Sequence, residues 1–350
     1  MVLCLLFAAA TFSLCAAEDS TVSTANSAAT NSSEPQPYIR VTKPDTNTVQ
    51  LDIALRKFIP VSGTGPAIWL AGTAHLGEPE YYHTLQKFLD AQTVVLFEGV
   101  NARAHPRKVP KPGASAEPEP DLPSEPKTSE GTNTAYSLQP ELAKSLGLVF
   151  QLDAIDYDRT NFLNSDLSIF DIQKLMLDDP KAMPAQPGQP GRSSATFDAL
   201  LQIMDGSSFL GSIYKWMVQY IGRSPELQAT TRLMFVQMLG DLTGDMAEMR
   251  GAPPELQHLL KVLIEKRNQN VVEDLKTELA IVPADGSIAV FYGTGHMPDL
   301  EKRVVHELHY RPVEDKWYTA FGADIRKTGM SAAQVQWLEK LIKAEMEMMK

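Results

Sequence analysis

Cysteine is nearly absent from the sequence, and so are basic clusters and long apolar runs. Cys4 and Cys15 are the only cysteines in 350 residues, so the chain beyond them can form neither a disulfide framework nor a thiolate metal site. The formal charge is −11 and Lys and Arg are scattered, which argues against a nucleic-acid partner. Beyond the first residues, no apolar run reaches the roughly 18 residues that a membrane-spanning helix needs.

Residues 1–17 have the pattern of a secretory signal peptide. An apolar run from Val2 to Leu14 is followed by the small residues Ala16 and Ala17, although no Lys or Arg precedes the run. The bulky Leu14 before Cys15 argues against a lipid anchor on that cysteine. We therefore expect an exported protein, periplasmic or extracellular, with no transmembrane helix in the mature chain.

The rest of the chain divides by composition. Residues 18–37 are rich in Ser, Thr, Asn and Ala, which predicts a disordered linker. Proline-rich stretches predict flexible insertions at 104–135 and 180–194. With 43% apolar residues, residues 38–330 can bury a sizeable core, and residues 331–350 predict a C-terminal helix that Ser331 caps.

The pattern of apolar residues predicts an α/β domain. Strands are expected at residues 38–42, 49–58, 67–72, 93–98, 149–155, 287–292 and 313–321, and helices at 79–89, 140–146, 168–178, 297–309 and repeatedly within 195–281. Strand, helix and strand over residues 67–98 form a βαβ unit, so its two strands should be parallel with a right-handed crossover.

Two Gly-Thr-x-His motifs carry the main functional signal. Gly72-Thr73-Ala74-His75 and Gly293-Thr294-Gly295-His296 each follow an apolar strand, and Glu98 follows the strand at 93–98. Glycine lets the backbone turn sharply at a strand end. In open α/β sheets, sites form beyond the carboxyl ends of the strands. If the strand before His296 is near, both histidines and the glutamate converge.

Two imidazoles and a carboxylate are a ligand set for a divalent metal such as Zn, Mn or Co. The sequence therefore predicts His75, His296 and Glu98 as metal ligands, with a metal-bound water activated for hydrolysis. A carboxylate at the end of a buried strand is costly unless it is paired or ligating. Glu98 could instead act as a general base.

Other polar residues give weaker signals. Arg267 and Asn268 are candidate catalytic residues, because an arginine among apolar helix positions could stabilise an oxyanion or clamp a carboxylate; a solvated helix face is the alternative. Three aspartates could add ligands, but loops favour aspartate for turn reasons. These are Asp156, Asp158 and Asp166. Surface positions are expected for His83, His105, His258, His306 and His309.

Taken together, these motifs resemble those of the TraB/PrgY/GumN family, which includes the TIKI proteases. The resemblance covers residues 67–100 and 255–310. It implies an α/β core of two related halves, like erythromycin-esterase and ChaN-like proteins, with a helical middle region. In the TIKI branch it implies a peptidase dependent on a divalent metal, with His75, His296, Glu98, Arg267 and Asn268 at the family's motif positions.

Several functions remain open from the sequence. The first is an exported metal-dependent hydrolase acting on a peptide or small-molecule substrate. A second is a protein that binds or sequesters a peptide or small ligand without turnover, as in the PrgY type. A third is metal-free hydrolysis with histidine as the base, and a fourth is membrane association through residues 209–221. The oligomeric state cannot be read from the sequence.

Overall fold

A computed structural model describes residues 37–99, 132–167, 171, 175, 218–241 and 262–349 of the chain. The expected leader and linker, the insertion at 180–194 and most of the insertion at 104–135 lie outside these residues. So do most of the helices expected at 168–178 and within 195–217 and 242–261, and so do His105 and His258. Among the described residues, no helix is long and apolar enough to cross a membrane.

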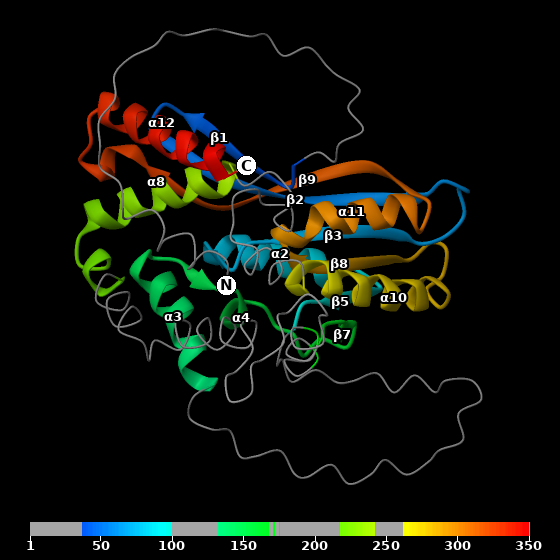
Figure 1. Cartoon of the computed structure of the whole chain (residues 1–350). Coiled ribbons are helices and arrows are strands. Elements are labelled where there is room, and N and C mark those ends of the chain that lie inside the picture. Colours follow the sequence, from blue (N-terminus) through cyan, green and yellow to red (C-terminus); the bar gives the residue numbers. More distant parts are fainter. Residues whose placement is uncertain are drawn as a thin grey trace, which may run out of the picture. The chain divides into compact units, whose positions relative to one another are not determined.

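The described chain has a mixed α/β fold around a seven-stranded mixed sheet (Figure 1). The strands lie in the order β1-β2-β3-β8-β5-β7, and β9 pairs with the other edge of β2. Their bounds are β1 Ile39–Asp45, β2 Thr48–Pro60, β3 Ala67–Thr73, β5 Val94–Phe97, β7 Phe162–Asn164, β8 Ser287–Gly293 and β9 Tyr310–Asp324. The α/β class predicted from the sequence is therefore confirmed.

One half of the sheet is antiparallel and is organised around β2. The long strand β9 pairs with β2 from Thr48↔Asp324 to Pro60↔Tyr310. The opposite edge of β2 is shared, because β1 pairs with its first half and β3 with its second half. The expected strand at 313–321 is thus the middle part of a longer strand, β9.

The other half is parallel and carries the motif strands. β8 pairs in parallel with β3 on one side and with β5 on the other, and β5 pairs in parallel with β7. The strands β3 and β5 are parallel as predicted, but β8 lies between them. In register, Thr73 lies beside Gly293 and Phe97 beside Phe291. All these strands end at one edge, and their nearly continuous apolar runs are typical of a parallel sheet covered on both faces.

Helices cover both faces of the parallel half. α10 (Arg267–Leu279) and α11 (Met297–His306) pack on one face, where residues such as Val272 and Leu300 join Ile68 and Leu70 in the core (Figure 1). α2 (Pro79–Asp90) packs on the other face. There the ring of Phe88 meets the ring of Trp69 of β3 edge to face, with the ring centroids 5.0 Å apart. Successive residues of a strand point to opposite faces, so Trp69 points away from its neighbours Ile68 and Leu70.

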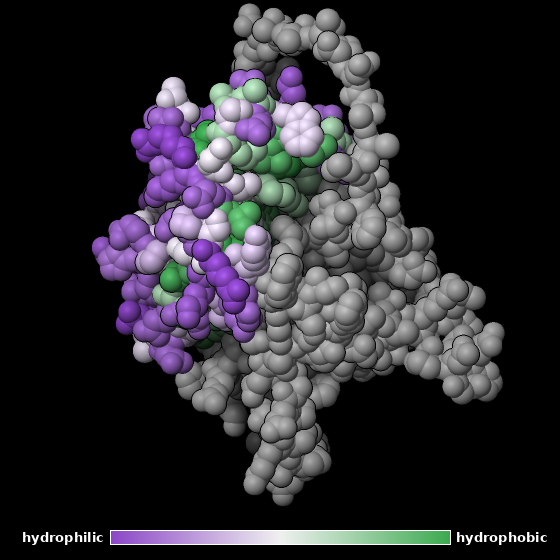
Figure 2. Space-filling view, turned by 90° about the vertical axis from the view of Figure 1, so that its left-hand side faces the viewer, coloured by the Kyte–Doolittle hydropathy of each residue, from purple (hydrophilic) through white to green (hydrophobic). Residues whose placement is uncertain are grey.

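A second helical layer lies beside the antiparallel half. α8 (Pro225–Asp241) packs against α12 (Ala332–Met349). The side chain of Ser331 accepts a hydrogen bond from the Gln334 amide, and the Gln334 side chain accepts one from the Ser331 amide. This reciprocal cap confirms the predicted helix start. Figure 2 shows the side on which these helices lie, where apolar patches interrupt a mostly hydrophilic surface.

Two predicted elements differ from the structure. The strand predicted over 149–155 is wrong beyond Phe150. There, β6 (Val149–Phe150) pairs only with the short β4 (Leu76–Gly77), and the chain then turns into α4 (Gln151–Ala154). The helix expected from Pro140 begins earlier, because α3 spans Thr132–Ser145 and contains Pro140. Its first residues fall inside the stretch predicted as a flexible insertion.

Candidate functional site

The two motif histidines and Glu98 leave the same edge of the sheet, as the sequence predicts. His75 follows β3, Glu98 follows β5, and His296 closes the short helical turn after β8. The backbone amide of Glu98 donates to the Phe291 carbonyl at 3.0 Å, which extends the β5–β8 pairing to the glutamate itself. The order β3-β8-β5 therefore brings the three side chains toward β8.

Glycine 293 lies at the point where these side chains converge. Its amide donates to Oε2 of Glu98 at 2.8 Å. A Cβ built at Gly293 would lie 3.3 Å from Glu98 Oε2 and 3.6 Å from Nε2 of His75. Nε2 of His296 lies 3.8 Å from the other Glu98 oxygen, Oε1. His296 thus approaches Oε1 of Glu98, while His75 Nε2 and Oε2 of Glu98 lie around Gly293.

Arg267 binds this carboxylate from α10. Its Nη2 donates to Glu98 Oε1 at 2.7 Å, and it makes a two-point contact with Asp166 at 2.8 and 2.5 Å. Both partners are largely buried, and the Arg267 side chain is only 8% exposed. The alternative of a solvated helix face is therefore wrong for Arg267. A π-helical turn, Val262–Lys266, precedes the residue, and such turns are frequent at functional sites.

Two hydrogen bonds with residues at the ends of the strands fix the position of Asp166. Its Oδ2 accepts from the Gly99 amide at 3.1 Å, and its own amide donates to the Asn164 side chain at 3.0 Å. The sequence marked Asp166 as a possible metal ligand, whereas the structure pairs it with Arg267. Asp156 and Asp158 are exposed and take no part in this cluster.

Asn268 fixes the tautomer of His296. The Asn268 amide group donates from Nδ2 to the His296 carbonyl at 3.1 Å and to Asp299 at 2.8 Å. Its oxygen therefore faces Nδ1 of His296, at 2.7 Å. An amide oxygen can only accept, so Nδ1 carries the proton and Nε2 presents a lone pair. That lone pair lies beside Glu98, and 3.5 Å from Nη1 of Arg267.

The electrostatics keep the cluster in one charge state. Burial lowers the pKa of His296 to about 4, so the imidazole is neutral at neutral pH. Burial would raise the pKa of Glu98, but the Arg267 guanidinium and the hydrogen bond from the Gly293 amide outweigh it and hold the pKa far below its usual range. His75 is exposed, although the protein packed around it disfavours the charged ring and lowers its pKa. Glu98 is thus a permanent anion between neutral imidazoles and a guanidinium.

The sequence did not single out Gln151 and Tyr157, which also border the site. The backbone amide of Gln151 donates to the His75 carbonyl at 2.9 Å, and the side-chain Nε2 of Gln151 donates to the Tyr157 hydroxyl at 2.9 Å. The Tyr157 ring packs at 5.0 Å from Phe97, the residue before Glu98. No sequence motif identifies either residue, because the position of both depends on the turn from β6 into α4.

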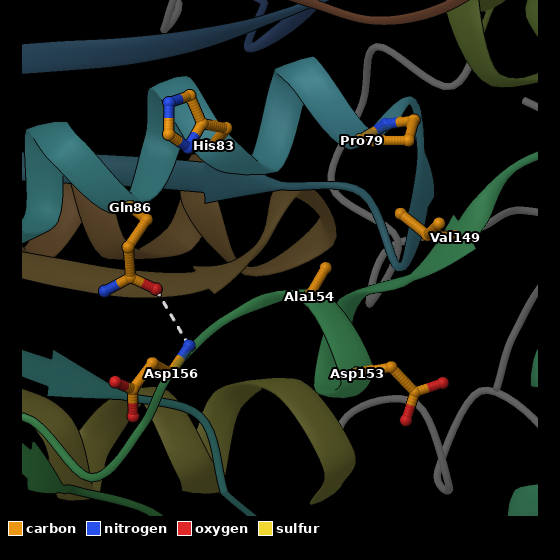
Figure 3. A pocket seen from close by; sticks show the side chains of 7 residues that line it. All are labelled: Pro79, His83, Gln86, Val149, Asp153, Ala154 and Asp156. Atoms are coloured by element: carbon orange, nitrogen blue, oxygen red, sulfur yellow. Dashed lines mark hydrogen bonds between the residues drawn. The ribbon is translucent and has the colours of Figure 1, made fainter.

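The remaining described histidines lie outside the cluster. His306 and His309 are exposed. His83, on α2, lines a separate pocket of 370 Å³, whose opposite wall is formed by β6, α4 and the residues after them (Figure 3). Gln86 crosses from α2 to accept a hydrogen bond from the Asp156 amide at 2.8 Å. The wall facing His83 is thus the segment that carries Gln151.

The donor types at the strand ends suit a divalent transition metal. The His296 Nε2 lone pair is available and Glu98 is ionised, and imidazole with carboxylate is a common set for such metals. Within the described ranges, however, no three His, Cys, Asp or Glu side chains already stand where they could hold an ion together. Because Arg267 donates to Glu98 Oε1, these side chains would have to move before they could hold an ion together.

No protein-family model, curated protein or solved structure matches the chain.

Proposed function

We propose that this chain is an exported hydrolase, acting on a peptide or related small substrate, whose reaction centre is the cluster of His75, His296, Glu98 and Arg267. The observation that carries the proposal is that both motif histidines and the largely buried Glu98 carboxylate lie around Gly293. Export rests on the pattern of residues 1–17 alone.

The proposal includes a core of two related halves, each ending in a Gly-Thr-x-His motif. The two motif strands are neighbours and run in register, with Gly72 beside Tyr292 and Thr73 beside Gly293. Each motif also leads into a helix with proline in its first turn, Pro79 in α2 and Pro298 in α11. These parallels support the relation between the halves that the family resemblance implies.

In the metal-dependent form, His75, His296 and Glu98 would hold the ion. A bound divalent metal supplies a polarised carbonyl and an activated water. Glu98 suits the role of ligand better than that of general base, because a base works best with a pKa near the working pH and the pKa of Glu98 lies far below it. Nη1 of Arg267 lies 3.5 Å from His296 Nε2 and would donate to negative charge that develops on the substrate.

One observation favours a metal-free variant of this hydrolase. The Arg267 guanidinium already contacts Glu98 and lies 3.5 Å from His296 Nε2, so a fixed cation is present without a metal. In that variant the exposed, neutral His75 would serve as the base. Arg267 would then stabilise the oxyanion.

The test uses purified full chain and a library of quenched fluorescent peptides, with and without Mn²⁺, Co²⁺ or Zn²⁺. Activity that requires the metal and is lost in His75→Ala and Glu98→Gln, but kept in the exposed-site control His306→Ala, supports the metal-dependent form. Activity that survives excess chelator but not His75→Ala supports the metal-free form. If no metal binds and His75→Ala keeps whatever activity is found, the proposal is wrong.

A further inference from the structure

We propose that Gln151 is the positioning residue of His75, matching the role of Asn268 toward His296, so that both imidazoles present an unprotonated Nε2 to Glu98. The inference rests on the proposed function only for the role that this orientation of His75 would have in the reaction. The orientation of His75 is a property of the protein alone, and it applies to the metal-dependent and the metal-free forms.

The backbone places Gln151 directly against the histidine. It is the first residue of α4, and its amide donates to the His75 carbonyl at 2.9 Å. The neighbouring pair Leu76↔Phe150 joins the two segments as antiparallel strands. The Gln151 side chain therefore starts from a fixed point beside the imidazole, and it is only 4% exposed.

The side-chain amide of Gln151 has one satisfied end and one unsatisfied end. Nε2 donates to the Tyr157 hydroxyl at 2.9 Å, which orients the group, whereas Oε1 is buried and has no hydrogen-bond partner among the residues that the structure describes. A buried acceptor without a partner destabilises the fold, because it has lost its hydrogen bonds to water. Gln151 bonds His75 through its backbone, and the side chains of the two residues interact. A ring N–H of His75 is thus the donor that Oε1 lacks.

The other histidine already has this arrangement in full. Asn268 uses its amide nitrogen elsewhere and offers its oxygen to His296 Nδ1 at 2.7 Å. In His75, Nε2 is the atom directed toward Gly293, at 3.6 Å from the position of a Cβ there. Nδ1 is therefore the nitrogen left for Gln151. Polar groups that orient a histidine in this way set its tautomer and the direction of its lone pair.

The experiment reads the tautomer by ¹⁵N NMR of ¹⁵N-histidine-labelled full chain, without metal or substrate, at about pH 8, above the ordinary pKa of histidine. His75 is assigned from the signal that disappears in His75→Gln. We expect His75 with its proton on Nδ1. The same tautomer should persist in Gln151→Glu, which keeps an acceptor, and should give way to the Nε2–H form in Gln151→Met.

The matched control is Gln92→Met, since Gln92 is another buried glutamine, one that bonds Phe88 and Ser287 instead of a histidine. It should leave the His75 signal unchanged. A wild-type His75 with its proton on Nε2 would overturn the inference, and so would an unchanged tautomer in Gln151→Met. If Gln151→Met does not fold, the His75 tautomers measured in the wild type and in Gln151→Glu still test the inference.

Metal titration gives a second readout. Gln151→Met should weaken any metal binding by about 10–100-fold, the usual loss when a group that orients a ligand is removed, and Gln151→Glu should not. A protein that binds no metal and hydrolyses nothing, yet shows the Nδ1–H tautomer, would refute the proposed function and leave this inference intact.

Discussion

Arg267 is the residue on which the charge balance of the cluster depends. It pairs with two carboxylates at once, with Glu98 at 2.7 Å and with Asp166, whose side chain is fully buried, at 2.5 Å. Burying a charge is tolerable only when it is paired and hydrogen-bonded. The arrangement therefore explains why a glutamate can end the buried strand β5.

Replacing Arg267 by methionine should destabilise the fold strongly. Removing one partner of a buried pair costs about 3–5 kcal/mol, because the other charge stays behind without compensation. Urea unfolding of Arg267→Met measures the loss. The control is Arg326→Met, which removes an arginine that pairs with Asp324 at the exposed surface and should change stability little. Equal effects of the two variants would mean that the buried cluster is not a tightly coupled unit.

His296 should make stability depend on pH. The ordinary pKa is near 6.5 and that of the folded protein is about 4, so the unfolded chain binds more protons between these values. Stability is therefore complete above about pH 6.5 and is lost as the pH falls toward 4. Without metal, we expect the free energy of unfolding to drop by about 2 kcal/mol from about pH 7 to about pH 5.

The variant His296→Gln should reduce this drop, whereas His306→Gln, at an exposed position of α11, should retain it. Denaturant titrations at both pH values measure the difference. Identical slopes in all three proteins would show that His296 is not buried as a neutral ring.

At the scale of secondary-structure elements, Gly72 and Gly293 lie near the ends of β3 and β8 and have different roles. A Cβ at Gly72 would meet backbone, since the Ala54 carbonyl lies 3.2 Å away and Thr294 Cγ2 3.0 Å away. A Cβ at Gly293 would meet only the ends of the Glu98 and His75 side chains. Gly293 has φ −53°, which alanine adopts freely.

The two alanine variants should therefore separate folding from function. Gly72→Ala should lose about 1–3 kcal/mol of stability through overpacking. Gly293→Ala should keep its melting temperature near that of wild type while it displaces Glu98 and weakens metal binding or hydrolysis at least about tenfold, a change of about 1.4 kcal/mol. Calorimetric melting and metal titration of both variants check this. A Gly293→Ala protein with unaltered binding and activity would show that the reaction does not occur at this glycine.

Much of this element-level design could be predicted from the sequence. The apolar runs ending in Gly-Thr-x-His and in Glu98 predicted the strands and the parallel direction of β3 and β5, whereas the convergence of His296 with His75 and Glu98 was predicted only on the condition that its strand lay near. The insertion of β8 between β3 and β5 could not be derived, because register and strand order depend on pairs such as Ala67↔Ser287 and Val94↔Ile288, which lie far apart in the sequence. The role of Gln151 was missed for a local reason: residues 149–155 are a short, mostly apolar segment interrupted by Gln151 and Asp153, and periodicity over so few residues does not distinguish a strand from a helix.

The role of Asp166 shows a further limit. Sequence reasoning offered it as a metal ligand or a turn residue, because the type of side chain alone does not reveal its partner. Only the approach of α10 to the end of β7 assigns it to Arg267. The charged partner of a buried arginine is thus a tertiary property.

At the scale of the described fold, β2 ties the antiparallel half of the sheet to the half that carries the site. Its Arg56 is 3% exposed and binds Asp315 of β9 and Glu301 of α11, each at 2.7 Å. This pair of contacts fixes α11, the helix that follows His296. The antiparallel strands therefore serve the site indirectly, by holding the helix that leaves its second motif.

The most direct test of the central claim is anomalous diffraction from crystals of the full chain grown or soaked with Mn²⁺, Co²⁺ or Zn²⁺. The account predicts an anomalous peak at about 2.0–2.2 Å from Nε2 of His75, Nε2 of His296 and an oxygen of Glu98, with Arg267 retained by Asp166. A structure in which the two imidazoles do not face the same carboxylate, or in which the metal binds only elsewhere, would contradict it.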